Sequence, residues 1–248
     1  MIVVAVIQAR MGSNRLPGKA MLQLGQSPAI CHVVQRTLES EMIDRVVVAT
    51  SEHKRDDIIE VFASNAGASV YRGDENDVLG RMYGSAKEYD ADIVVRITGD
   101  CPLIDPEIVD LTINTLIETN ADYVSNTVQR TFPRGLDTEV FTMESFERVV
   151  EKSEEPYERE HVTPYYKEHM SEFEIDQVTS DMVFDEPQFK DRTDIRITLD
   201  EYDDYSLLSE VFDEFGNDGR PDIRSVIRFI DSNNLTQINE SVEQKTLD

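Results

Sequence analysis

The feature that most constrains the fold is an alternation of strand-length apolar runs with amphipathic stretches of helical length. Three runs, at residues 2–7, 45–49 and 92–97, are rich in β-branched residues and almost free of polar ones, which is typical of central strands buried on both faces. Helical patterns at 28–38, 54–65 and 76–89 separate these runs, with a short strand expected at Val70 and Tyr71. This order predicts an α/β fold with a mainly parallel sheet covered by helices on both faces.

The alternation continues with a helix expected over 106–118 and a strand over 122–124, and it breaks down beyond residue 126. There we expect a helical region over 146–168 that breaks near Pro156, helices over 202–215 and 222–231, and strands over 137–141, 173–178 and 194–199. The strand at 194–199 is expected to return to the first sheet. The 248 residues are therefore predicted to form a single domain with a regular half (1–125), a mixed half (126–232) and a frayed tail (233–248).

The charge balance excludes some partners. The chain has 50 acidic and 24 basic residues and a net charge of −26, so duplex nucleic acid and anionic membranes are poor partners. Only seven of the basic residues are lysine. A low lysine content combined with many carboxylates resembles halophilic proteins of salt-rich cytoplasms, where salt screens the repulsion. An ordinary acidic mesophilic protein is the alternative.

Localisation and redox chemistry are also constrained. No run approaches the ~20 apolar residues of a spanning helix, and residues 2–7 are too short and lack the basic flank of a signal peptide. We expect a soluble, cytoplasmic protein. Cys31 and Cys101 lie 70 residues apart, which predicts two buried thiols rather than a disulfide framework or a zinc site.

The first 38 residues of this acidic chain contain no Asp or Glu. At one acid in five, such a run has a chance probability on the order of 10⁻⁴, so an anion is expected to bind there. The first strand runs into the loop 8–19, which carries Arg10, Arg15 and Lys19 and includes Gly12, where the backbone can approach a ligand closely. Ligands of open α/β sheets bind beyond the carboxyl ends of the strands. A triphosphate is the expected ligand.

Two familiar phosphate-binding loops are excluded. A Walker A loop has four residues between its glycine and its Gly-Lys pair, followed by Ser or Thr; here Gly12 and Gly18 enclose five, and Ala20 follows Lys19. The dinucleotide-binding fingerprint, with three spaced glycines and an acidic ribose ligand, is also absent.

Carboxylates at the ends of two predicted strands are candidate metal ligands. Asp100 follows the strand at 92–97, and Asp200 follows the strand at 194–199. If these strand ends lie together, both side chains converge on one Mg²⁺. Asp200 is equally well explained as a helix cap, and Asp105, which precedes Pro106, is expected to cap the next helix.

Four segments together resemble the cytidylyltransferases that activate acidic sugars, the CMP-Kdo and CMP-sialate synthetases, and most closely the branch of spore-coat polysaccharide biosynthesis protein F. They are residues 8–19 (QARMGSNRLPGK), 96–103 (RITGDCPL), 158–165 (EREHVTPY) and 196–200 (RITLD). The resemblance spans residues 2 to about 229. It implies a nucleotide-diphospho-sugar transferase fold, a GT-A-like three-layer sandwich with a mixed, mainly parallel sheet, and a homodimer.

The resemblance also assigns roles to residues. The CTP phosphates would be held by Arg10, Gly12, Ser13, Arg15 and Lys19, with Gln8 also in the nucleotide site. The catalytic Mg²⁺ would be held by Asp100 and Asp200, and the base and ribose by Arg72, Asp77 and Arg81. An exposed helix face explains the last three equally well. The Kdo and sialate enzymes have proline where this chain has Gln8, so their sugar specificity does not transfer.

The sugar is expected over the second half. Its candidate ligands are Ser125, Asn126, Arg134, Asp137, Glu139, Arg159 and His161. Arg134 or Arg159 would pair with the carboxylate of a nonulosonic acid or a Kdo-like sugar, whereas His161 is equally well explained as a packed polar residue. The leading hypothesis is CMP transfer from CTP to such a sugar; the alternatives are another nucleotide, a sugar 1-phosphate acceptor, or a non-catalytic nucleotide-sugar-binding protein.

Overall fold

The computed structural model describes residues 1–215 and 220–243. A seven-stranded sheet with strand order β5-β4-β1-β6-β8-β7-β9 forms its centre, and only β8 runs antiparallel to the other strands. The strands are β1 (Val3–Gln8), β4 (Arg45–Ser51), β5 (Ser69–Gly73), β6 (Ile93–Thr98), β7 (Tyr123–Ser125), β8 (Glu139–Thr142) and β9 (Ile175–Gln177); β2 (Gln23–Leu24) and β3 (Ser27–Pro28) form a separate hairpin.

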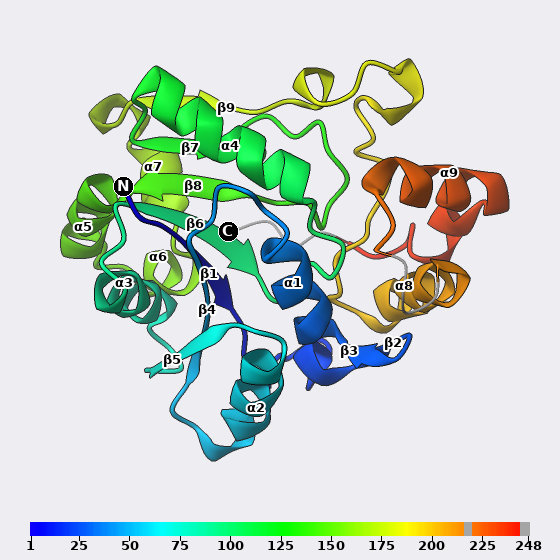
Figure 1. Ribbon diagram of the computed structural model, residues 1–248, viewed down its shortest axis with the longest axis horizontal. Coiled ribbons are helices and arrows are strands. Elements are labelled where there is room, and N and C mark those ends of the chain that lie inside the picture. Colours follow the sequence, from blue (N-terminus) through cyan, green and yellow to red (C-terminus); the bar gives the residue numbers. More distant parts are fainter. Residues whose placement is uncertain (216–219, 244–248) are drawn as a thin grey trace.

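Helices cover both faces of the sheet, which gives the expected three layers (Figure 1). Alternate residues of β1 face opposite sides, since Val3, Ala5 and Ile7 belong to one apolar cluster and Val4 and Val6 to the other. The first cluster packs against α1 (Ala29–Thr37), α2 (Asp57–Asn65), α4 (Pro106–Thr119), α8 (Tyr202–Phe215) and α9 (Ile223–Asn233). The second packs against α3 (Val78–Glu88), α5 (Met143–Lys152) and α7 (Pro164–Glu168), with α6 (Pro156–His161) beside α3. The expected α/β fold is confirmed.

One predicted strand is wrong. Residues 194–199 were expected to join the sheet, but they form only an isolated bridge between Arg196 and Arg134. Their backbone pairs with loops instead: the Ile197 amide donates to the Arg134 carbonyl at 2.7 Å, and the Leu199 amide donates to the Asp100 carbonyl at 2.8 Å. The segment therefore lies beyond the carboxyl end of β6, where its partners are loop residues. Gly135 permits this approach, because a Cβ there would lie 2.6 Å from the Ile197 backbone.

The expected frayed tail is also corrected for residues 233–243. Leu235–Ile238 form a 3₁₀ turn, and buried Asn239 donates hydrogen bonds to the Arg196 carbonyl (2.9 Å) and to Asp204 (2.8 Å). Residues 244–248 lie outside the described range. Both cysteines are buried free thiols, as expected. None of the described helices is long and apolar enough to cross a membrane.

Candidate active site

The loop after β1 folds back on itself. Gly18 adopts a left-handed backbone conformation (φ 74°), its amide donates to the Met11 carbonyl at 3.0 Å, and the chain then enters the 3₁₀ turn that begins at Lys19. This turn aims the Lys19 side chain back toward the strand ends. Gly12 faces the Arg55–Glu75 ion pair, and a Cβ there would meet both side chains at under 3 Å.

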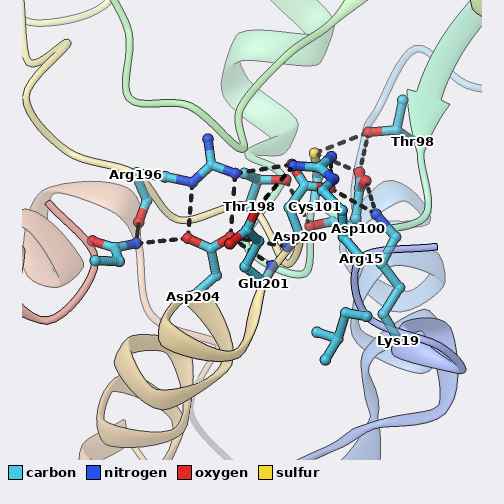
Figure 2. Close-up of polar contacts among 12 residues, drawn as sticks. Arg15, Lys19, Thr98, Asp100, Cys101, Arg196, Thr198, Asp200, Glu201 and Asp204 are labelled. Carbon is cyan, nitrogen blue, oxygen red and sulfur yellow. Dashed lines mark hydrogen bonds and ion pairs between the residues drawn. The ribbon is translucent and has the colours of Figure 1, made fainter. Parts of the chain in front are cut away.

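Lys19 joins the two carboxylates that the sequence analysis singled out (Figure 2). Its Nζ lies 2.6 Å from Asp100 Oδ2 and 2.8 Å from Asp200 Oδ1. Arg15 Nη2 lies 2.8 Å from the same oxygen of Asp200. The predicted convergence of Asp100 and Asp200 is therefore present in the structure, with the Lys19 ammonium between them.

Asp100 and Lys19 are both ionised at neutral pH. Burial acts to raise the pKa of Asp100, but its contacts with Lys19 outweigh that effect and lower the pKa from 3.8 to about 2. Burial acts to lower the pKa of Lys19, and the two carboxylates outweigh it, so this pKa lies above its ordinary value of 10.5. Thr98 Oγ1 donates to Asp100 Oδ1 at 2.5 Å and fixes the remaining oxygen.

Asp200 is held by a buried network and does not act as a helix cap. Its Oδ2 accepts from Arg196 Nη2 at 3.0 Å, and Arg196 is in turn bound by the fully buried Asp204 at 2.8 Å. The amides of Asp200 and Glu201, which precede α8, both donate to Asp204 in its first turn at 3.0 Å, as they do to the first-turn acid of a capping box. The cap expected at Asp105 is confirmed, since Asp105 accepts from the amides of Glu107 and Ile108.

Asp100 and Asp200 line a cavity of about 750 Å³, whose lining is more positively charged than the protein as a whole. Eight cationic side chains line it against five acidic ones, although acids outnumber cations two to one in the chain. The cations are Arg10, Arg15, Lys19, Arg81, Arg96, Arg130, Arg134 and Lys167, and the acids are Asp100, Asp137, Glu139, Glu160 and Asp200. A third of the basic residues of the chain therefore surround one cavity, which favours an anionic ligand.

Two buried nitrogens at this cavity have no hydrogen-bond partner among the residues that the structure describes: Arg15 Nη1, which lies 3.9 Å from a Glu201 oxygen, and Arg81 Nε. A buried guanidinium nitrogen without a partner is costly unless a ligand satisfies it. Gln8, Arg10 and Ser13 also line the cavity, whereas Gly12 lines an adjoining one. The residues expected to hold phosphates are thus brought to one place.

The structure separates the three residues expected near the base and ribose. Arg81 lines the cavity, but Arg72 and Asp77 do not. Arg72 is bound by Asp57 and Glu60, at 2.7 and 2.9 Å. Asp77 caps α3 by accepting from the Gly80 amide and pairs with Arg159 at 2.6 Å.

Of the residues expected to bind the sugar, some line the cavity and others do not. Arg134, Asp137, Glu139 and His161 line the cavity, whereas Ser125, Asn126 and Arg159 do not. Asn126 is 1% exposed and ties β7 to the loop before β8, since it donates to the Leu136 carbonyl (2.7 Å) and accepts from the Thr138 amide (2.9 Å). Ser125 is fully buried beside it and donates to the Thr138 carbonyl. These two residues therefore have a structural role, because they fix the end of β7 to the loop before β8.

Several lining residues were missed by the sequence analysis. Arg96, in a motif already singled out, donates to Glu139 and, at 3.1 Å, to Gln8 Oε1. Glu139 is buried and also accepts from Tyr123 (2.6 Å) and Thr163 (2.8 Å). Arg96 follows two residues after buried Val94 on the same face of β6, a spacing that could have flagged it. The other two cations that were missed, Arg130 and Lys167, had no such signal.

The sequence profile of the cytidylyltransferase family matches residues 4–237. An uncharacterized protein of Methanocaldococcus jannaschii is 37% identical over 99% of this chain and 98% of its own length. The spore coat polysaccharide biosynthesis protein SpsF of Bacillus subtilis is 31% identical over 89% of this chain and 90% of its own length. The chain therefore belongs to the cytidylyltransferase family, as the resemblance implied, and is a nucleotidyltransferase.

Solved structures agree with this assignment. A cytidylyltransferase from Leptospira borgpetersenii superposes with a TM-score of 0.88, at 35% identity, over 99% of this chain and all of that one. A synthetase for CMP-2-keto-3-deoxy-manno-octonic acid, solved with CTP, superposes with a TM-score of 0.54 over 72% of this chain and 90% of that one; at 18% identity it supports the fold alone.

Proposed function

We propose that this enzyme transfers CMP from CTP to an acidic sugar of the nonulosonic or Kdo-like type, for surface glycan or polysaccharide biosynthesis. The observation that carries the proposal is the concentration of eight cations around one cavity of a strongly acidic protein. A triphosphate beside a sugar carboxylate is an anion that matches such a cavity in size and charge.

In this proposal the first half of the chain binds the nucleotide. Arg10, Ser13 and Arg15 hold the phosphates, together with Gln8 and with the backbone at Gly12, which lines the adjoining cavity. A sugar hydroxyl attacks the α-phosphorus, the new P–O bond replaces the bond to the β-phosphate, pyrophosphate leaves, and the hydroxyl proton passes to solvent. Lys19 lies where it can neutralise the charge that grows on the phosphates during this step.

Asp100 and Asp200 fit Mg²⁺, because two hard oxygens converge on one point and Mg²⁺ prefers one or two carboxylates with phosphate and water oxygens. The described residues contain no group of three or more His, Cys, Asp or Glu side chains that would form a complete protein site. The ion would supply charge neutralisation to the phosphates.

Arg134 is the proposed partner of the sugar carboxylate. It lines the cavity, whereas Arg159, the other candidate, is bound by Asp77 and lies outside it. Asp137, Glu139 and His161 complete the acceptor side of the cavity. By the family resemblance we also propose a homodimer, and we propose that the enzyme works in the cytoplasm.

The test is a pyrophosphate-release screen of four nucleoside triphosphates against nonulosonic acids, Kdo and sugar 1-phosphates, in molar KCl. We expect release with CTP and an acidic sugar. Release only with another nucleotide or with a sugar 1-phosphate would replace this proposal by those alternatives, and no release with any pair would favour a non-catalytic binding protein.

The carboxylates offer a sharper test. Asp100→Asn and Asp200→Asn should each abolish metal-dependent turnover, and the double variant should be little worse than either, because the two residues act as a unit. Asp203→Asn, a neighbouring carboxylate outside the cavity, is the matched control and should keep its activity. Near-normal turnover of Asp200→Asn alone would contradict the two-carboxylate site.

A further inference from the structure

The position between Asp100 and Asp200 already holds a cation that belongs to the protein. The same two oxygens that would bind a metal ion, Asp100 Oδ2 and Asp200 Oδ1, both contact Lys19 Nζ, at 2.6 and 2.8 Å (Figure 2). Mg²⁺ binds carboxylate oxygens at about 2.0–2.1 Å. An ion at that distance from both oxygens would nearly coincide with the ammonium, so the two cations exclude each other.

The charges around this position nearly balance. Asp100, Asp200 and Asp204 carry three negative charges, and Lys19, Arg15 and Arg196 carry three positive ones, all joined by the contacts in Figure 2. Glu201, 3.9 Å from Arg15 and 42% exposed, adds a fourth negative charge at the edge of the cluster. Adding Mg²⁺ alone would therefore leave an uncompensated positive charge in a partly buried cluster, which is unfavourable at short range. A nucleoside triphosphate brings the negative charge that is missing.

Lys19 is also better able to move than Arg196. Arg196 is only 7% exposed and is held by Asp204, Asp200 and further contacts. The contacts described for the Lys19 ammonium are those with the two carboxylates, and its four-carbon stem is flexible. The cavity in front of it is the one lined by Arg10 and Arg15, where the triphosphate is proposed to bind.

We infer that the Lys19 ammonium occupies the metal position in the nucleotide-free enzyme, and that the nucleotide frees this position by drawing the ammonium onto its phosphates. This inference rests on the proposed function for the identity of the ligand. Binding of nucleotide and divalent cation is then coupled: the cation binds weakly to the free enzyme and tightly once Lys19 has left the carboxylates.

The test is Mn²⁺ binding to the nucleotide-free enzyme, measured by electron paramagnetic resonance of the unbound ion. Lys19→Met keeps the length of the side chain, removes its charge and should bind Mn²⁺ at least about tenfold more tightly than the unsubstituted protein. Lys167→Met removes one charge from the same cavity but not from the carboxylate pair, and its Mn²⁺ affinity should change much less. Adding Asp100→Asn to Lys19→Met should abolish the gain.

An equal gain in both lysine variants, or none in Lys19→Met, would overturn the inference. A second measurement uses the unsubstituted protein and so does not depend on the folding of a variant: the ¹⁵N signal of the Lys19 ammonium should shift with metal-free CTP and stay unchanged with Mg²⁺ alone. A shift with Mg²⁺ alone would contradict the inference. Neither measurement needs turnover, so failure of the pyrophosphate screen with a positive Mn²⁺ result would reject the proposed function only.

Discussion

At the scale of single residues, Lys19 is the side chain on which the proposed chemistry depends most. Because it is expected to neutralise charge that grows in the transition state, Lys19→Ala should lower kcat more than it weakens nucleotide binding, with a loss of about 2–4 kcal/mol in kcat/KM. Steady-state kinetics with CTP varied would separate the two effects. Lys190→Ala, away from the cavity, is the control. Wild-type turnover in Lys19→Ala would mean that the loop is a structural turn without a role in the reaction.

Glu139 gives a pH-dependent prediction. Burial acts to raise its pKa, but Arg96, Lys167 and two hydroxyl donors outweigh it and lower the pKa from 4.5 to about 2. The unfolded chain therefore takes up this proton first as the pH falls. The stabilising contribution of the carboxylate is complete above about pH 4.5 and is lost as the pH falls toward 2.

Glu139→Gln should accordingly show a shallower decline of the unfolding free energy between pH 4.5 and 2 than the unsubstituted protein, as measured by urea denaturation at a series of pH values. Glu151→Gln, on the exposed side of α5, should follow the unsubstituted curve. Identical slopes in all three proteins would mean that Arg96 does not hold Glu139 ionised.

At the scale of secondary structure, the ends of helices and strands matter because they position the side chains of the site. The N-terminus of α4 follows directly from the loop that carries Asp100, and Asp105 caps it. Asp105→Ala should cost about 0.5–2 kcal/mol in unfolding free energy, whereas Asp105→Asn, which keeps an acceptor, should cost less. Urea denaturation measures both. An equal loss in the two variants would mean that the charge of Asp105, 4.0 Å from Arg36, matters more than its cap.

At the scale of the whole molecule, the net charge of −26 predicts a dependence on salt. The Debye length grows from about 3 Å at 1 M salt to about 30 Å at 0.01 M, so removing KCl should increase self-repulsion and lower Tm. Differential scanning calorimetry over this range is the measurement. A flat Tm would contradict the halophilic interpretation and leave the enzymatic proposal untouched.

The elements of the first half could be predicted closely because their signals are local. Buried parallel strands read as unbroken β-branched runs, and the helices between them carry their own apolar period. Residues 194–199 have the same local signal as β6, yet they pair with loops at Arg134 and Asp100. Local pattern predicts an extended chain but does not choose its partner, because that choice depends on which backbone edges the rest of the fold leaves open.

The sequence by itself determined which chemistry the chain offers: an acid-free loop with Arg10, Arg15 and Lys19, and carboxylates placed after two apolar runs. Only the tertiary structure decided which of these groups meet. Lys19 pairs with carboxylates that lie 81 and 181 residues away in the sequence. Arg159 forms an ion pair with Asp77 outside the cavity, whereas Arg134 lines the cavity. An ion pair forms between charges that the fold brings within a few ångströms of each other. That proximity is set by the order of the strands and the packing of the loops, so it cannot be predicted from the local sequence around either side chain.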